Sequence, residues 1–343
     1  MPRPVQTSVS DGVGQLVLDR PEALNALDLE MIARMSGALD AWRDDDAVRA
    51  VLVTSSSPKA FCAGGDIRAV RRAALDLDPD TVRRYFVAEY ALDAAVADFP
   101  KPYVSLIDGY ALGGGLGISV HGRYRVVTER AALAMPETGI GFFPDVGAGH
   151  FLSGLPGATG MYLGLTGTRV SGAAAVECGL ATHYVDSADL PALTADLLRD
   201  GGRSTGEVLT RYAVTPPASE LHGLRPAIDR CFGGPSLDGV LERLGAEGGE
   251  GGEWAAETLA VLERMSPSCL VLTFELLRRG ARSTLRECFA RDLLLAERLA
   301  TTPDFAEGVR AALVDKDRTP RWSPATLADL DPAYRGRLLS MLD

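Results

Sequence analysis

Short, mostly apolar runs alternate with segments of helical periodicity along the first 200 residues of this chain. Asp28 is a good N-cap, and Met31, Ile32, Met35, Leu39 and Trp42 then recur at helical spacing. This alternation predicts an α/β architecture with parallel strand pairing. The predicted strands are 13–19, 48–54, 103–107, 124–128, 131–135 and 181–185, and the predicted helices include 81–97 and a short one capped by Ser171.

The character of the chain changes near residue 200. A segment with two glycines and two prolines at 201–217 is typical of a linker. Beyond it the pattern is helical, and the predicted helices are 254–265, 268–279, 284–300 and 304–314. We therefore predict a core at 1–200 and a helical region at 201–343.

Composition narrows the class of protein. The net charge of −11 argues against nucleic-acid binding, which needs basic patches. No window of about 20 apolar residues and no apolar leader segment is present, so we expect no membrane contact and a cytoplasmic location. The five cysteines are scattered without a CxxC pair, and the histidines lack ligand spacing, so no metal site is expected. Cys62 is expected to be a small packed residue.

Two glycine-rich segments follow predicted strands. The segment 109–118 has three adjacent glycines before a helix-compatible run, and 61–66 reads FCAGGD. The segment 109–118 does not match the GxGxxG or P-loop pattern, and Ser119 misses the GxSxG pattern by its last residue. Amide donors from two such loops suit an oxyanion hole for an acyl carbonyl. The alternative is two ordinary tight turns.

Three acids stand in apolar sequence. Glu137 and Asp145 are the only acids in 131–168, a stretch without Lys or Arg although the chain has 35 of them. Burial would raise their pKa values toward neutrality, where a carboxyl group exchanges protons; the alternative is two solvated loop acids. Glu89 falls within the apolar stripe of 81–97, which indicates a polar pocket wall. The alternative is an acid paired with Arg83 or Arg84, although these lie on other sides of the helix.

Three motifs together resemble the crotonase superfamily of acyl-CoA enzymes: KAFCAGGD at 59–66, KPYVSLIDGYALGGG at 101–115 and MPETGIGFFPDVG at 135–147. The general match covers about 13–200. Similarity to the 3-hydroxyisobutyryl-CoA hydrolase subgroup continues through 266–268, 305–318 and Trp322. The resemblance implies a crotonase-type spiral of ββα units followed by a C-terminal helical region.

The resemblance also implies roles for single residues. The thioester carbonyl would lie between the backbone amides of Gly65 and Gly114, in agreement with the oxyanion hypothesis above. Hydratases of this family carry a glutamate three residues past the middle glycine, where this chain has Gly117. The pair Glu137 and Asp145 resembles the hydroxyacyl-CoA hydrolase pattern instead. Glu89 matches an acid of that subgroup that contacts substrate, so we expect Glu89, Gly114, Glu137 and Asp145 to bind substrate.

The resulting hypothesis is hydrolysis of a short 3-hydroxyacyl-CoA, with 3-hydroxyisobutyryl-CoA first and 3-hydroxypropionyl-CoA second. Glu137 would attack the carbonyl or activate water, and Asp145 would orient groups and move protons; the sequence does not divide these roles. The alternative is enoyl-CoA hydratase, isomerase or other crotonase-type chemistry at the same oxyanion hole. No cofactor is expected, since CoA is part of the substrate. The resemblance further suggests valine catabolism and, because family members often assemble, a homo-oligomer.

Overall fold

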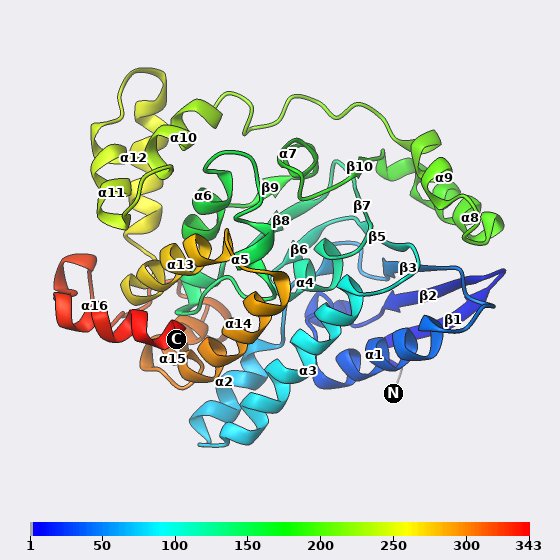
Figure 1. The fold of residues 1–343 in the computed structure, drawn as a ribbon, viewed down its shortest axis with the longest axis horizontal. Helices are drawn as coiled ribbons and strands as arrows, with labels where there is room; N and C mark the ends of the chain where they lie inside the picture. The colour runs from blue at the N-terminus through cyan, green and yellow to red at the C-terminus, as the bar shows by residue number, and fades with distance from the viewer. Residues whose placement is uncertain (1–2) are drawn as a thin grey trace. The chain divides into compact units, whose positions relative to one another are not determined.

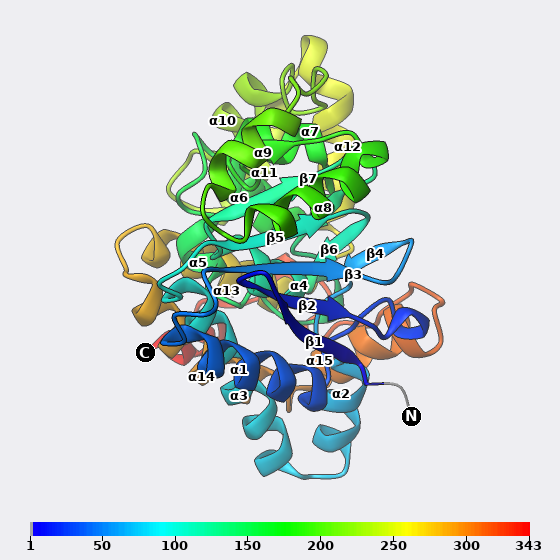
Figure 2. The same ribbon diagram turned by 90° about the vertical axis from the view of Figure 1, so that its right-hand side faces the viewer.

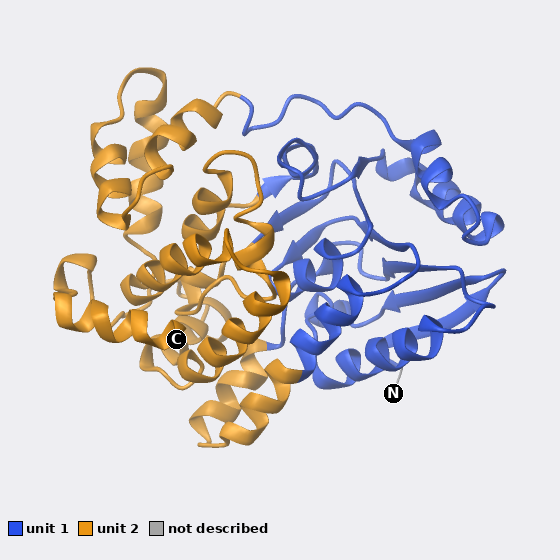
Figure 3. Cartoon of the chain, in the orientation of Figure 1, with its two compact units in different colours: residues 1–66, 88–134, 170–222 blue, residues 67–87, 135–169, 223–343 orange. Residues whose placement is uncertain are grey.

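The computed structural model describes residues 3–343. It divides into two compact units, each built from three segments of the chain (Figure 3). Unit 1 contains residues 1–66, 88–134 and 170–222, and unit 2 contains residues 67–87, 135–169 and 223–343. The division into compact units follows other boundaries than the predicted division at residue 200 and does not test it. The core at 1–200 and the helical region at 201–343 therefore stay a prediction.

Unit 1 holds two sheets (Figure 1). The larger has the order β1-β2-β3-β5-β7-β10, with β1 antiparallel to β2 and every later pair parallel. Figure 2 shows β1, β2, β3, β5 and β7 of this sheet side by side. Its strands are β1 (Val5–Ser10), β2 (Val13–Leu18), β3 (Ala50–Ser55), β5 (Tyr103–Ile107), β7 (Tyr124–Val127) and β10 (His183–Tyr184).

The second sheet has the order β4-β6-β8-β9. Each of three successive repeats adds one strand to each sheet: β3 is followed by β4, β5 by β6, and β7 by β8. Helical segments follow β4, β6 and β8, so these repeats are the ββα units that the resemblance implies. Its strands are β4 (Ala60–Cys62), β6 (Tyr110–Leu112), β8 (Ala132–Ala134) and β9 (Val170–Ser171).

Helices cover the larger sheet within unit 1. In α1 (Leu29–Arg43), Asp28 accepts a hydrogen bond from the Met31 amide at 2.8 Å, and the five apolar residues expected on one face are buried. Valine and leucine side chains of the strands pack on α8 and α9 in one apolar cluster. The other helices of unit 1 are α4 (Gly114–Val120), α7 (Gly172–Cys178), α8 (Leu190–Asp200) and α9 (Thr205–Tyr212).

Unit 2 is helical. Helix α3 (Pro79–Ala97) begins in unit 2 and ends in unit 1. In unit 2 the Phe142 ring stacks on Phe86 and also contacts Phe143 and Phe305. The remaining helices are α2 (Ile67–Leu75), α5 (Ala148–Phe151), α6 (Thr159–Thr166), α10 (Arg225–Phe232), α11 (Leu237–Ala246), α12 (Gly252–Leu262), α13 (Pro267–Gly280), α14 (Leu285–Leu299), α15 (Pro303–Val309) and α16 (Pro332–Leu339).

The α/β prediction is confirmed, and most predicted elements are present within a few residues. One difference lies at 201–217, where helix α9 occupies part of the expected linker, because Val208 and Leu209 pack into the apolar cluster of unit 1. Another lies at 304–314, where α15 ends at Val309 and a π-helical turn follows at Arg310–Val314. Within 3–343, no helix is both long enough and apolar enough to cross a membrane.

Candidate active site

A polar network in unit 1 holds the loop that carries Gly65. The Asn25 side chain is buried and donates to the Ser55 hydroxyl at 2.7 Å and to the Phe61 carbonyl at 3.0 Å. Its own carbonyl oxygen accepts from the Arg20 amide at 2.8 Å. Arg20 also forms an ion pair with Asp66 at 3.0 Å. Both ends of the loop are therefore fixed by residues that the sequence analysis did not single out.

The amides of Gly65 and Gly114, predicted to bind a carbonyl, come from neighbouring segments of unit 1. Leu27 pairs with Gly65 through the Gly64 carbonyl and the Asp66 amide, so the Gly65 amide points away from Leu27. Gly114 is the first residue of α4, and the first amides of a helix have no acceptor within it. The Gly65 nitrogen lies 3.3 Å from the position that a Cβ on Gly114 would occupy.

Two acids of α3 face the glycines of α4. Glu89 is buried, as predicted, and one of its carboxylate oxygens meets the place where a Cβ of Gly114 would lie. One turn further along, Asp93 is wholly buried, and its oxygens lie 2.7 and 2.8 Å from the place of a Cβ on Gly117. Unit 1 thus brings Gly65, Gly114 and Glu89 together, and it adds Asp93 to the same group.

Cys62 and Ser119 lie beside this group, but both are in states unsuited to nucleophilic attack. Burial raises the pKa of the Cys62 thiol to about 12, and the nearby charges of Glu89 and Asp93 act in the same direction. The thiol is therefore protonated at neutral pH, which agrees with the expected packing role. The Ser119 hydroxyl is buried and donates to the Gly115 carbonyl within its own helix at 2.7 Å.

Glu137 and Asp145 are both buried in unit 2, as their apolar sequence context predicts. Glu137 begins the 3-10 turn Glu137–Ile140, and its carbonyl accepts from the Phe142 amide at 3.0 Å. Gly141 follows with φ +70°, and a side chain there would collide with the backbone of Asp304. The turn is therefore shaped by close packing, and solvated loop acids are excluded. The chemical roles of Glu137 and Asp145 stay predictions.

Asp292 is an acid of unit 2 that the sequence analysis missed. It is wholly buried in α14, and one of its oxygens accepts from the Gly147 amide at 2.8 Å. Burial raises its pKa well above the usual range, and the charge of Asp145 adds to the shift. The signal was present in the sequence, because Asp292 interrupts an apolar stripe that includes Cys288 and Leu295.

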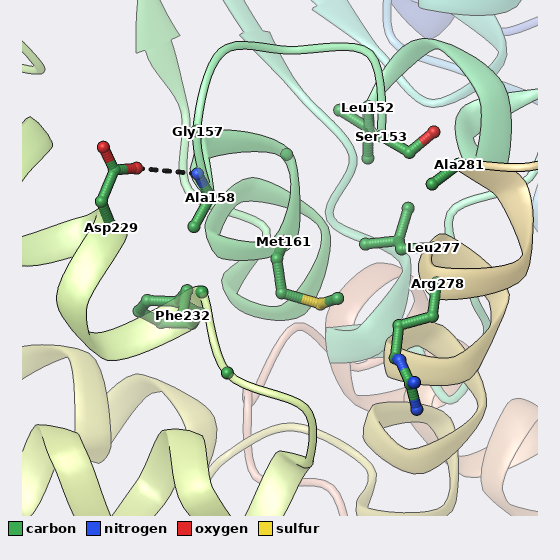
Figure 4. A pocket seen from close by; sticks show the side chains of 13 residues that line it. Leu152, Ser153, Gly157, Ala158, Met161, Asp229, Phe232, Leu277, Arg278 and Ala281 are labelled. Atoms are coloured by element: carbon green, nitrogen blue, oxygen red, sulfur yellow. Dashed lines mark hydrogen bonds between the residues drawn. The ribbon is translucent and has the colours of Figure 1, made fainter.

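A cavity of about 410 Å³ lies within unit 2 and contains none of the predicted site residues (Figure 4). Leu152, Met161, Phe232 and Leu277 contribute apolar walls. The one acid of its lining, Asp229, accepts from the Ala158 amide at 2.7 Å and so has a structural partner. Nothing in this lining resembles an acid–base pair. Among residues 3–343, no group of three His, Cys, Asp or Glu side chains could hold a metal ion.

Comparison with known proteins gives a consistent family. The model of the enoyl-CoA hydratase/isomerase family matches residues 13–339. A zebrafish (Danio rerio) protein named "3-hydroxyisobutyryl-CoA hydrolase, mitochondrial" is 41% identical over 338 residues, which cover 96% of this chain and 87% of that protein. The human (Homo sapiens) protein of the same name is 39% identical over 325 residues, which cover 92% of this chain and 83% of that protein.

Solved structures support the predicted fold. A carnitinyl-CoA dehydratase from Mycobacterium thermoresistibile has a TM-score of 0.91 at 38% identity and covers 98% of this chain and 96% of its own. An enoyl-CoA hydratase from Rhodobacter sphaeroides has a TM-score of 0.90 at 37% identity and covers 98% of this chain and 97% of its own. These similarities confirm the crotonase-type fold.

The predicted cytoplasmic location is wrong, because the comparisons point to mitochondria: the zebrafish, chicken, rat and human relatives are all named as mitochondrial proteins. The error has a physical reason. Scattered cysteines without a CxxC pair are compatible with more than one reducing compartment, so they did not single out the cytoplasm.

The family match spans nearly the whole chain, and the motifs at 59–66, 101–115 and 135–147 lie inside it. The relatives add 41% and 39% identity over more than nine-tenths of the chain. The chain therefore belongs to the enoyl-CoA hydratase/isomerase family, the crotonase superfamily that its motifs resemble.

Proposed function

We propose that this protein hydrolyses 3-hydroxyisobutyryl-CoA to the free hydroxy acid and CoA. The observation that carries the proposal is the 41% identity, over 96% of the chain, to a protein named as a hydrolase of this substrate. Related short 3-hydroxyacyl thioesters, above all 3-hydroxypropionyl-CoA, are the next candidates. In a cell the reaction would belong to valine catabolism. It needs no cofactor, because CoA is part of the substrate.

The amides of Gly65 and Gly114 would polarise the thioester carbonyl and stabilise the oxyanion that forms on it. Their closeness in unit 1 supports this role, since an oxyanion hole needs two donors aimed at one oxygen. Glu89, which packs against Gly114, would accept a hydrogen bond from the substrate's 3-hydroxyl group. Its burial supports the role, because a buried carboxylate is stabilised by a hydroxyl donor.

Glu137 and Asp145 would carry the acid–base work. Either Glu137 adds to the carbonyl and forms an anhydride that water then opens, or it takes a proton from water as the water attacks. In both routes the C–S bond breaks, the thiolate of CoA leaves and takes up a proton, and Asp145 moves or holds that proton. The burial of both acids supports the proposal, because it keeps the two carboxyl groups away from bulk water.

The second candidate is hydration or dehydration of an enoyl-CoA, which the names of the two solved relatives favour. Hydratases of the family use a glutamate at the position of Gly117, and glycine has no side chain to act there. In addition, the Asp93 carboxylate already occupies the space next to Gly117. These two observations favour hydrolysis over hydration.

The deciding experiment measures free thiol with a thiol-reactive dye on 3-hydroxyisobutyryl-CoA, 3-hydroxypropionyl-CoA, acetyl-CoA and crotonyl-CoA. We expect rapid thiol release from the two 3-hydroxyacyl thioesters only. Loss of enoyl absorbance on crotonyl-CoA without thiol release from any substrate would contradict the proposal and support the hydratase.

Two isosteric variants test the acids. Asp145→Asn and Glu137→Gln should each lower turnover by about 10²-fold or more, the usual scale for losing an acid–base group. Glu22→Gln, on an exposed acid of the turn Pro21–Ala23, is the matched control and should keep full activity. A Glu137→Gln protein with undiminished hydrolysis would end the mechanism.

A further inference from the structure

Asp145 lies at the start of a strained turn. The Asp145 carbonyl accepts from the Ala148 amide at 2.8 Å, and the two residues between them both have positive φ, +50° at Val146 and +80° at Gly147. A β-branched residue such as valine strongly disfavours this region. Backbone strain of this kind costs about 1–3 kcal/mol and persists only where the surroundings hold it.

Asp292, which is far from the turn in sequence but in contact with it, stabilises the strained backbone. Its Oδ2 atom accepts from the Gly147 amide at 2.8 Å across 145 positions of sequence. Its Oδ1 atom has no hydrogen-bond partner among the described residues. An acid in the apolar stripe of α14 is costly to bury, so a leucine would suit the packing of the helix better. Among residues 3–343, the hydrogen bond from the Gly147 amide is the one that the Asp292 carboxylate accepts.

We infer that Asp292 is a positioning residue that fixes the turn of Asp145 through the Gly147 amide. Without the acceptor, the Gly147 amide would be a buried donor with no partner, and the strained turn would relax. The Asp145 carboxylate would then move, and Asp292 would act through the turn. The catalytic part of this inference rests on the proposed thioester hydrolysis.

The protonation state of Asp292 suggests the right variants. Burial, and next the charge of Asp145, favour the neutral form, while the hydrogen bond from Gly147 opposes them. Asparagine at position 292 copies the neutral acid in shape and keeps an acceptor oxygen. Leucine has a similar size but no acceptor. Leu295→Ala, on the same buried face of α14, is the control for a general loss of stability.

The experiment compares Asp292→Asn, Asp292→Leu and Leu295→Ala with the wild type by two measurements. Hydrogen exchange of a peptide that spans 142–151 reports the turn without any substrate. Thiol release from 3-hydroxyisobutyryl-CoA gives kcat and KM. In Asp292→Leu we expect at least about 10-fold faster exchange of the turn and about 10²-fold lower kcat with little change in KM, the scale for a catalytic group misplaced by about 1 Å. Asp292→Asn should stay within about 3-fold of wild type in both measurements.

The inference fails if Asp292→Leu and Leu295→Ala give the same exchange and the same kcat. It also fails if Asp292→Asn is as impaired as Asp292→Leu, because the acceptor oxygen would then not be what holds the turn. A wild-type protein that releases no thiol would refute the proposed function instead. In that case the exchange measurement still decides whether Asp292 anchors the turn.

Discussion

Replacing Gly117 with alanine tests whether Asp93 fills the space beside this glycine. A Cβ at position 117 would lie 2.7 and 2.8 Å from the two Asp93 oxygens, closer than a Cβ and an oxygen approach in folded proteins. Asp93 is short and wholly buried, so its carboxylate has little room to move. Overpacking of this kind costs about 1–3 kcal/mol. Alanine also gains about 1 kcal/mol over glycine in a helix interior, which partly hides the clash.

Gly37→Ala removes that complication. Gly37 lies inside α1, and apart from the backbone of its own helix and its chain neighbours no atom lies within 4 Å of its Cβ position, so alanine there brings the helical gain alone. In urea denaturation, Gly117→Ala should therefore be about 1–3 kcal/mol less stable than Gly37→Ala. Most of the difference should vanish when both substitutions are made in an Asp93→Ala background. Equal stabilities of Gly117→Ala and Gly37→Ala in the wild-type background would refute the reasoning.

Two further predictions concern the same part of unit 1. Gly114→Ala places a Cβ against the Glu89 carboxylate and 3.3 Å from the Gly65 nitrogen. The kcat for thiol release should therefore fall by about 10²-fold, the scale for losing one oxyanion donor. The control, Gly37→Ala, should keep its activity. For Cys62, the raised thiol pKa means that the folded protein keeps a proton between pH 9 and about 12 that the unfolded chain loses. In this range the free energy of unfolding of the wild type should therefore fall with rising pH more steeply than that of Cys62→Ala, by about 1.4 kcal/mol for each pH unit. Parallel curves for the two proteins would contradict this prediction.

Local sequence signals predicted much of this fold. Asp28 and Ser171 cap the helices that follow them because capping depends on a residue and its next three neighbours. The strand at 103–107 matches β5 in both bounds, since a short run that is apolar except for Ser105 suits a buried parallel strand. By contrast, β4 and β6 have three residues each and form through pairing with distant segments, which no local pattern predicts.

The candidate site divides in the same way. Burial of Glu89, Glu137 and Asp145 could be predicted, because each acid stands in an apolar pattern of its own segment. The hydrogen-bond partner of Asp292 could not be predicted, because nothing in the sequence of α14 indicates that the Gly147 amide is the donor. The support that Asn25 gives the Gly65 loop was equally hidden, since it depends on the paths of three segments.

The glycines of α4 illustrate that a motif can predict a chemical role and still leave the packing around it unpredicted. We predicted their backbone amides as donors, and that argument needs only Gly114. The structure shows a second reason for glycine at these positions. The Glu89 carboxylate packs against the Cβ position of Gly114, and the Asp93 carboxylate packs against that of Gly117. Two acids one turn apart on α3 thus meet two glycines three residues apart on α4. A side chain at 117 and the present position of Asp93 exclude each other, so any residue larger than glycine at 117 requires the Asp93 carboxylate to move.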